Sequence, residues 1–207
     1  MIVTYNKDHV GDVLLILLAE DEGAKREVTR RGRMARIFNS DTGETLAWNI
    51  FEASSLLSLE NSGQVILSAD QVAILNDALA AEQFDESLIE DTQPKFVVAE
   101  IAAIEVHPDS DHLHICQVNI GNGKATQIVC GAPNARQGLQ TIAALPGAMM
   151  PDGTLIFPGK LRGVDSYGML CSARELGLQN ALQERGIIEL AGAVIGEAFD
   201  PEKHWRA

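Results

Sequence analysis

Residues 96–130 read FVVAEIAAIEVHPDSDHLHICQVNIGNGKATQIVC, and this stretch decides how the second half of the chain folds. Three runs rich in apolar and β-branched residues, 96–106, 113–120 and 126–130, are separated by the turn-forming groups His-Pro-Asp at 107–109 and Gly-Asn-Gly at 121–123. Two shorter runs follow at 141–144 and 154–157. Five short strands joined by such turns favour a small antiparallel β-barrel of the Greek-key type.

The second of these runs has an irregular pattern. Leu113 and Ile115 alternate on one face, whereas Val118 and Ile120 are shifted by one position. A bulge near residues 116–117 would reconcile the two registers, as bent barrels often require. Beyond the barrel, residues 186–199 contain the apolar group Ile-Ile-Glu-Leu at 187–190, and we expect them to return as strands against the barrel or the first domain.

The first half of the chain predicts an α+β domain. Strands are expected at 1–5 and 13–19, and a hairpin at 34–39 and 45–51. Ser68 and Gln71 have the spacing of a capping box, so a helix should run from there to about residue 83. Its apolar stripe is Val72, Leu75 and Leu79, and Ile74 lies off it. Because Gln93-Pro94 is a plausible linker, we expect domains at 1–92 and 95–200.

Composition and charge restrict the function. The 207 residues include 16 Lys and Arg against 29 Asp and Glu, a net charge of −13, which is the wrong sign for a partner that is a polyanion. Residues 1–94 carry −10 of this charge and residues 95–207 only −3. The longest apolar run, 13–19, is far shorter than the ~20 residues of a membrane-spanning helix. With no secretory signal and three cysteines, an odd number, we expect a cytoplasmic protein with reduced thiols.

A series of longer motifs runs across the barrel region in a fixed order. They are VVAEI at 97–101, VHPDSDHL at 106–113, IVCGAPN at 128–134, LPGA at 145–148, LRGVDSYGMLCS at 161–172 and ELGL at 175–178. In this order they resemble the tRNA-binding domain of the bacterial phenylalanyl-tRNA synthetase β subunit, a module also appended to some methionyl- and tyrosyl-tRNA synthetases. The whole chain is similar to the bacterial YtpR family. The resemblance implies an OB-fold, a five-stranded Greek-key barrel, that binds tRNA.

Basic, amide, hydroxyl and apolar side chains that suit RNA gather near these motifs, and the expected tRNA-binding residues are Lys160, Arg162, Ser166, Met169, Ser172, Asn134 and Arg136. Lys160 and Arg162 can meet phosphates. Ser166 and Ser172 offer hydroxyls, and Met169 offers a flexible apolar contact for an unstacked base or ribose. In the family the serine and methionine of this S-x-x-M segment lie at the tRNA-binding surface. Met169 could equally belong to the core.

The only cluster of basic residues is arginine-rich and lies at 26–36 in the first domain. It could extend a tRNA-binding surface. The alternative is an exposed loop or an edge strand that its charges protect from pairing with other chains.

The sequence lacks the residue patterns that are typical of enzymes. His112, His114 and Cys116 alternate along one strand, but the sequence has no C-x-x-C or H-x-x-x-H pair, so we expect no metal site. Neither a G-x-x-x-x-G-K-[ST] phosphate loop nor a G-x-G-x-x-G motif after a strand is present, and we expect no cofactor. The chain is too short for the catalytic machinery of a synthetase. We therefore expect no catalytic residues.

These patterns together predict a non-enzymatic protein that binds tRNA weakly and by its shape. An almost neutral barrel can release few counterions, so the affinity should be low. A homodimer would compensate by avidity. The alternative function is a protein-binding or chaperone-like module on the same fold, which the negative net charge favours and residues 160–172 do not.

Overall fold

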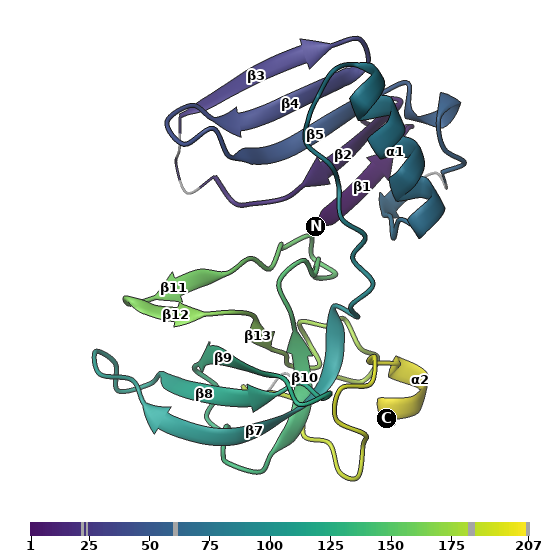
Figure 1. The fold of residues 1–207 in the computed structure, drawn as a ribbon. Coiled ribbons are helices and arrows are strands. Elements are labelled where there is room, and N and C mark those ends of the chain that lie inside the picture. The colour runs from purple at the N-terminus through teal and green to yellow at the C-terminus, as the bar shows by residue number, and fades with distance from the viewer. Residues whose placement is uncertain (22, 24, 60–61, 182–184, 206–207) are drawn as a thin grey trace. The chain divides into compact units, whose positions relative to one another are not determined.

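The structure is a computed structural model that describes residues 1–21, 23, 25–59, 62–181 and 185–205 (Figure 1). The chain divides into two compact units, Met1–Thr92 and Gln93–Ala207. Separate clusters of buried apolar side chains form the cores of the two units. Each unit is therefore held together by residues of its own.

The first unit contains a six-stranded antiparallel sheet in the order β3-β4-β5-β2-β1-β6. Its strands are β1 (Ile2–Asn6), β2 (Val13–Leu17), β3 (Arg26–Arg31), β4 (Met34–Asn39), β5 (Thr45–Phe51) and β6 (Ser62–Gln64). The sequence predicts four of them. It misses β3 and β6 because neither has the apolar alternation that indicates a half-buried strand. Both are edge strands, and β3 carries Arg26, Arg30 and Arg31 of the arginine-rich segment, for which an edge strand was one alternative.

Helix α1 (Ala69–Ala81) follows the sheet, and a 3₁₀ turn, η1 (Ala53–Ser55), precedes the helix. The predicted capping box is confirmed: the Gln71 amide N donates to Ser68 Oγ at 3.3 Å, and the Ser68 amide N donates to Gln71 Oε1 at 3.0 Å. The predicted stripe is buried and consists of Val72, Leu75 and Leu79. Ile74 is 42% exposed, so only one side of the helix is packed.

The core of the first unit lies between the sheet and α1 (Figure 1). Successive side chains of a strand point to opposite faces, so alternate positions enter this core, among them Val3, Tyr5, Leu14, Ile16, Trp48 and Ile50. The ring of Trp48 meets that of Phe84 edge to face, with 4.8 Å between centroids. This contact anchors the chain beyond α1 against the sheet.

The second unit is built on a five-stranded antiparallel sheet in the order β13-β10-β7-β8-β9. The strands are β7 (Phe96–Val106), β8 (His114–Asn119), β9 (Ala125–Cys130), β10 (Gln140–Ala144) and β13 (Met169–Leu170). The sheet curls until its two edges nearly meet, because the Tyr167 amide N donates to the Gln127 carbonyl at 2.8 Å. A nearly closed barrel with this strand order is an OB-fold, which confirms the predicted fold class.

Two details of the predicted barrel are wrong. The fifth strand is β13, not 154–157, where Leu155 forms only an isolated bridge with Met149. Residues 147–156 instead close on themselves, since the Gly147 amide N donates to the Ile156 carbonyl and the Met150 amide N to the Thr154 carbonyl. The register shift lies between Ile101 and Ala103 of β7, on the strand opposite the predicted bulge. A pattern in one strand reports a register change in the pair and does not tell which strand carries it.

The connection from β10 to β13 contains a short hairpin of β11 (Gly159–Leu161) and β12 (Val164–Ser166). The Gln127 side-chain amide N donates to the Asp165 carbonyl at 2.8 Å, and Tyr167 pairs with the backbone of the same residue. The hairpin base is therefore fixed to β9.

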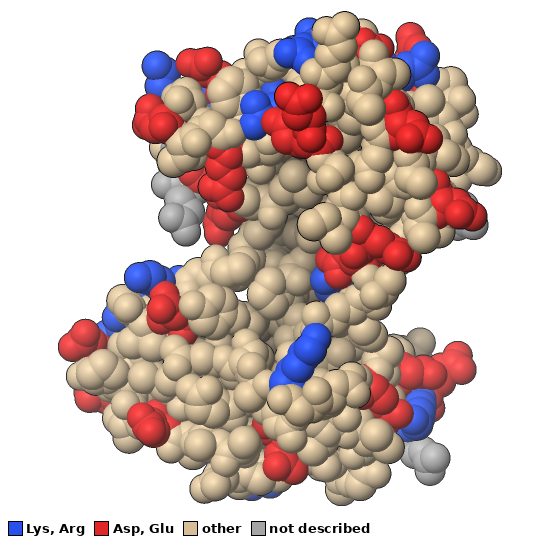
Figure 2. Space-filling view, viewed as in Figure 1, with Lys and Arg blue, Asp and Glu red and all other residues tan. Residues whose placement is uncertain are grey.

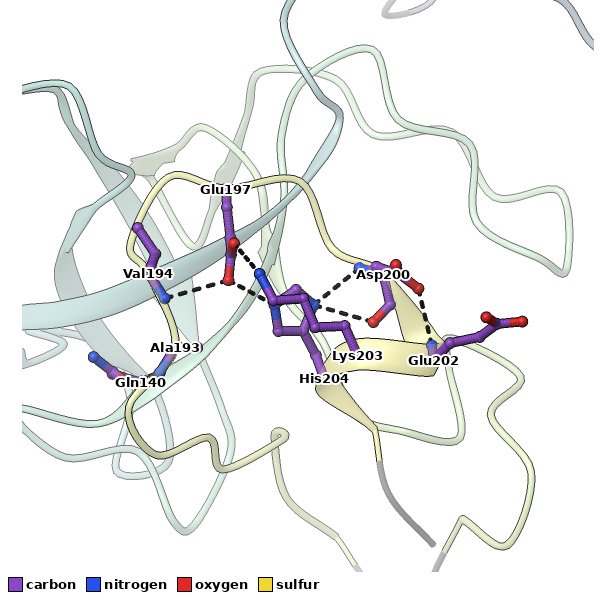
Figure 3. Close-up of polar contacts among 8 residues, drawn as sticks. All are labelled: Gln140, Ala193, Val194, Glu197, Asp200, Glu202, Lys203 and His204. Atoms are coloured by element: carbon purple, nitrogen blue, oxygen red, sulfur yellow. Dashed lines mark hydrogen bonds and ion pairs between the residues drawn. The ribbon is translucent and has the colours of Figure 1, made fainter.

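The C-terminal segment 186–199 packs on the barrel, but the prediction that it forms strands is wrong. It makes isolated bridges only, Gln140 with Leu190 and Val97 with Ala198. A helix, α2 (Pro201–His204), follows, and the Glu197 carboxylate contacts two of its side chains (Figure 3). Glu197 is paired with Lys203, and its Oε1 lies 2.7 Å from His204 Nε2. The left-handed glycines Gly192 and Gly196 interrupt any continuous ladder.

None of the helices in the described part of the chain has the length and apolar character needed to cross a membrane.

Candidate functional site

The tip of the β11–β12 hairpin carries two of the predicted site residues. Arg162 and Gly163 form its turn with φ of 46° and 83°, a left-handed conformation that is uncommon for arginine. The Arg162 guanidinium compensates by donating to the Asp109 carbonyl at 2.9 Å. Lys160 projects from β11 and pairs with Asp165 across the hairpin at 3.5 Å. Both cations therefore lie on a defined, solvent-exposed tip.

A buried histidine fixes this hairpin to the β7–β8 loop. His107 is only 2% exposed, and its Nδ1 accepts from the Asp109 amide N at 3.1 Å. Nε2 therefore carries the proton and donates to the Leu161 carbonyl at 3.1 Å. The two loops joined in this way, β7–β8 and β10–β13, are the L12 and L45 loops with which OB-folds bind oligonucleotides.

Ser166 lies inside the fold. It is 4% exposed, and its Oγ accepts from the Val129 amide N at 3.0 Å and lies 3.4 Å from the Gly168 carbonyl. The hydroxyl thus helps to close the barrel between β12 and β9. Its geometry suits a residue that positions the neighbouring surface, and not one that touches a ligand.

Met169 and Ser172 line a solvent-open cleft of ≈ 290 Å³. Its walls come from residues 129–133, 169–175 and 185–187, so three of the sequence motifs meet here. Ser172 Oγ donates to Glu175 Oε2 at 2.7 Å and accepts from the Glu175 amide N at 3.2 Å. The cleft also holds Arg174 and Arg185. Cations, a hydroxyl and an apolar wall are thus brought together.

Asn134 and Arg136 hold the C-terminal segment. The side-chain amide of Asn134 donates to the Ile187 carbonyl at 2.9 Å and accepts from the Ile187 amide N at 3.0 Å, as a neighbouring strand would. Arg136 forms a bidentate pair with Glu189 at 3.0 and 2.7 Å. Hydrogen bonds from Arg136 and then Asn134 lower the pKa of Glu189 to about 2. Asn134 also borders a second cleft of ≈ 210 Å³.

The predicted residues therefore fall into three groups. The cations Lys160 and Arg162 lie on the hairpin tip, and Met169 and Ser172 line the cleft. The remaining three, Ser166, Asn134 and Arg136, make contacts that shape the surroundings of these surfaces. Sequence reasoning missed the role of His107 and the place of Arg185. The proline after His107 signalled only a turn, and Arg185 lies outside every motif.

Charges of both signs are interspersed over the surface. On the face shown in Figure 2, Lys and Arg alternate with Asp and Glu and form no broad basic patch. The arginines of the first unit are engaged within it: Arg36 pairs with Glu86 at 2.7 Å and Arg26 with Asp21 at 3.2 Å. The Arg30 guanidinium stacks 4.1 Å from the centroid of Phe51. These contacts favour the edge-strand interpretation of the arginine-rich segment.

The three thiols are buried and unpaired. Burial raises the pKa of Cys116 and of Cys171 to about 12, and it also raises the pKa of Cys130. Among the described residues, no group of three or more His, Cys, Asp and Glu side chains is arranged to hold a metal ion. The cleft thus presents no thiolate, since the one cysteine that lines it, Cys130, is held in its protonated form.

The fold and these surfaces define a two-domain protein whose second domain is an OB-fold with linked L12 and L45 loops. Residues 96–197 match a family model described as "Putative tRNA binding domain", and residues 21–91 match one described as "Domain of unknown function (DUF4479)". The chain is 44% identical to the "Putative tRNA-binding protein YtpR" of Bacillus subtilis over 196 residues, which are 94% of this chain and 97% of that protein. The chain belongs to the YtpR family.

The second domain also has relatives among much longer proteins. It is 49% identical over 112 residues to the phenylalanine–tRNA ligase β subunit of Bordetella parapertussis, covering 51% of this chain and 14% of that one. The corresponding subunit of Thiobacillus denitrificans is 55% identical over 85 residues, 41% of this chain and 11% of that one. The likeness is therefore confined to one module of those subunits.

Proposed function

We propose that this protein is a non-catalytic tRNA-binding protein that recognises tRNA weakly and by shape. The observation that carries the proposal is the pair of cations on a hairpin joined to the L12 loop, in a domain that matches the "Putative tRNA binding domain" model. The name of the Bacillus subtilis relative supports the same function.

In this proposal the predicted site residues divide their roles. Lys160 and Arg162 meet phosphates, because their exposed tip can follow a sugar–phosphate backbone. Met169 and Ser172 contact a base or ribose at the cleft. The remaining three, Ser166, Asn134 and Arg136, position these surfaces through the hydrogen bonds described above.

Weak, shape-directed binding follows from the charges. Residues 95–207 carry a net charge of −3, and much of their positive charge is engaged in ion pairs such as Arg136 with Glu189 and Lys203 with Glu197. Few phosphates can then be neutralised, so the salt dependence of binding is shallow and the affinity micromolar or weaker. With few side chains placed to read base edges, the outline of the tRNA decides binding more than its sequence does.

The test is fluorescence anisotropy with labelled bulk tRNA at about 50 mM salt. A charged contact is worth roughly 1.5 kcal/mol, so loss of both hairpin cations lowers the affinity at least tenfold. The variant is Lys160→Ala with Arg162→Asn, because asparagine tolerates the left-handed backbone of that turn. Lys7→Ala with Lys25→Ala removes the same charge from the first unit and leaves binding unchanged.

If folded wild-type protein binds tRNA no better than duplex DNA, the tRNA proposal fails and a protein partner takes its place. The proposal also includes a cytoplasmic homodimer, in which two weak sites act together by avidity. Light scattering coupled to gel filtration checks the dimer, and a monomeric mass at tens of micromolar protein contradicts it.

The proposal that the protein is not an enzyme rests on the groups around the cleft. Hydrolysis through a covalent intermediate needs a nucleophile activated by a neighbouring base. The thiol that lines the cleft is that of Cys130, whose pKa burial raises, and the hydroxyl is that of Ser172, which shares Glu175 Oε2 with the Ser172 backbone amide; no histidine or lysine is among the described residues that line the cleft. Incubation of charged tRNA with the protein should leave the rate of deacylation unchanged.

A further inference from the structure

Two arginines of the second unit face one cleft without a carboxylate to neutralise them. Arg174 and Arg185 both line the cleft of ≈ 290 Å³, and no ion pair joins either of them to the rest of the described chain. Arg136, by contrast, is closed on Glu189 in a bidentate pair. The cleft does contain Glu175, but its carboxylate is held by the Ser172 hydroxyl and amide. Two cations against one engaged anion make this a site for a negatively charged group.

The walls of the cleft suit a flat ring as well as an anion. Pro133, Met169 and Leu170 supply apolar surface, and the small residues 131–132 also line the cleft. Met169 is the adaptable side chain among them, because its unbranched thioether can follow the outline of different rings. An arginine guanidinium can bind a phosphate bidentately or stack on a base. The cleft therefore matches a nucleotide better than it matches a simple anion.

A second cleft continues the first. The cleft of ≈ 210 Å³ shares Ser172, Arg185 and residues 186–187 with its neighbour, and it is also lined by Trp205 and by Glu189, whose charge Arg136 neutralises. The indole Nε1 of Trp205 donates to the Gln179 carbonyl at 2.8 Å, which holds the ring in place. Aromatic rings are the usual stacking platforms for single-stranded nucleic acid. The arginines and the tryptophan thus lie in sequence along one groove.

We infer that this groove binds a short unpaired segment of RNA, with phosphates on Arg174 and Arg185 and bases against Met169 and Trp205. The inference rests on the proposed function and assigns the unpaired part of the tRNA to a surface distinct from the hairpin tip. Clefts of ≈ 290 and ≈ 210 Å³ admit single nucleotides one after another. A paired and stacked base cannot enter such a cleft without leaving the duplex.

The experiment compares three competitors for labelled bulk tRNA: a six-nucleotide single-stranded RNA, a blunt-ended RNA duplex and poly-glutamate. For the wild-type protein the single strand should displace tRNA at a concentration at least tenfold below that of the duplex. In Arg174→Ala with Arg185→Ala, tRNA affinity falls about tenfold and the preference for the single strand disappears. Two fewer phosphate contacts also reduce the slope of log affinity against log salt by about 1.4. Lys7→Ala with Lys25→Ala is the charge-matched control.

Each outcome decides a separate point. If the wild type fails to bind tRNA at all, the proposed function and the groove inference both fall. If tRNA binds but the double arginine variant behaves as the wild type, or loses equal affinity for single strand and duplex, only the inference is overturned. Displacement by poly-glutamate as effective as that by RNA overturns it too, since the groove would then be a general anion site.

Trp205 offers an independent test of stacking. Trp205→Phe keeps a ring and should retain the preference for the single strand, whereas Trp205→Leu should lose it while binding of the blunt duplex stays unchanged. Circular dichroism of both variants checks that the barrel is folded. Equal single-strand affinities for the phenylalanine and leucine variants would show that no base stacks there.

Discussion

Replacing Asn134 by alanine should release the C-terminal segment from the barrel. The variant loses the two hydrogen bonds that its side chain exchanges with the backbone of Ile187, at 2.9 and 3.0 Å, and an exposed one to Glu189 Oε1 at 2.9 Å. At about 1 kcal/mol for each of the two backbone bonds, the second unit should lose roughly 2 kcal/mol of unfolding free energy. With a urea m-value of ~2 kcal/mol/M, the midpoint falls by about 1 M.

The assay uses the two tryptophans of the chain, one in each unit. In a Trp48→Phe background, fluorescence reports Trp205 and hence the second unit alone. Asn76 is the matched control, because its side chain exchanges the same two bonds with the backbone of Leu88 in the first unit, at 3.0 and 2.7 Å. In a Trp205→Phe background, Asn76→Ala should shift the unfolding transition that Trp48 reports. In the Trp48→Phe background, Asn76→Ala should leave the transition that Trp205 reports unchanged.

The result also separates two roles for Asn134. If Asn134 positions the C-terminal segment, the alanine variant loses stability and, because the segment is displaced, some affinity for tRNA. If Asn134 only touches RNA, the variant loses affinity while its urea midpoint moves by less than about 0.2 M. That second outcome would refute the reasoning, since it would mean that the bonds to Ile187 contribute nothing to folding.

Three further outcomes are expected. Native protein at pH 8 should react with a thiol reagent over hours and denatured protein at once, because the pKa of Cys116 and of Cys171 is raised to about 12; three rapid equivalents from native protein would contradict this. The pKa of Glu189 is lowered from 4.5 to about 2, so its stabilising pair with Arg136 is complete above pH 4.5 and is lost as the pH falls towards 2. Trp205 fluorescence should change over this pH range in the wild type, and the change should be absent in Glu189→Gln. Gly168→Ala should destabilise the barrel by more than ~1 kcal/mol, since its Cβ would lie 2.6 Å from the Ala144 carbonyl oxygen; Gly153→Ala, also at positive φ but with open space around it, should cost less in thermal unfolding.

The sequence predicts the parts of the fold whose side chains alternate clearly. Strands β1, β2, β5 and β7 to β10 follow runs of apolar residues, and α1 begins at its capping box. The errors lie where another force decides. β13 has only two residues and is placed by pairing with β10, and residues 186–199 are held by side-chain bonds from Asn134 and Arg136 that no periodicity in the segment records. Such contacts join residues about fifty positions apart and cannot be seen locally.

The sequence names candidate site residues but does not show where their side chains lie. It names the hairpin cations and Met169 because basic and flexible apolar residues beside a loop motif suit RNA, and their contact with RNA stays a prediction. Whether a polar side chain faces solvent could not be predicted. Ser166 and Asn134 have the same chemistry as a ligand-binding residue, and only the fold shows that their partners are Val129 and Ile187.

The structural role of many motif residues explains why strong sequence motifs accompany a weak electrostatic signature. Several polar side chains within the motifs, such as His107, Asn134 and Ser166, form hydrogen bonds that join loops and close the barrel. The unpaired cations of the groove, Arg174 and Arg185, lie outside the motifs. A motif match therefore indicates that the loops of the barrel are built and that the hairpin carries Arg162, whereas in the proposed function the binding of unpaired RNA also depends on Arg174 and Arg185 outside the motifs. Relatives with the same motifs and different residues at 174 and 185 should therefore share the fold and differ in affinity for unpaired RNA.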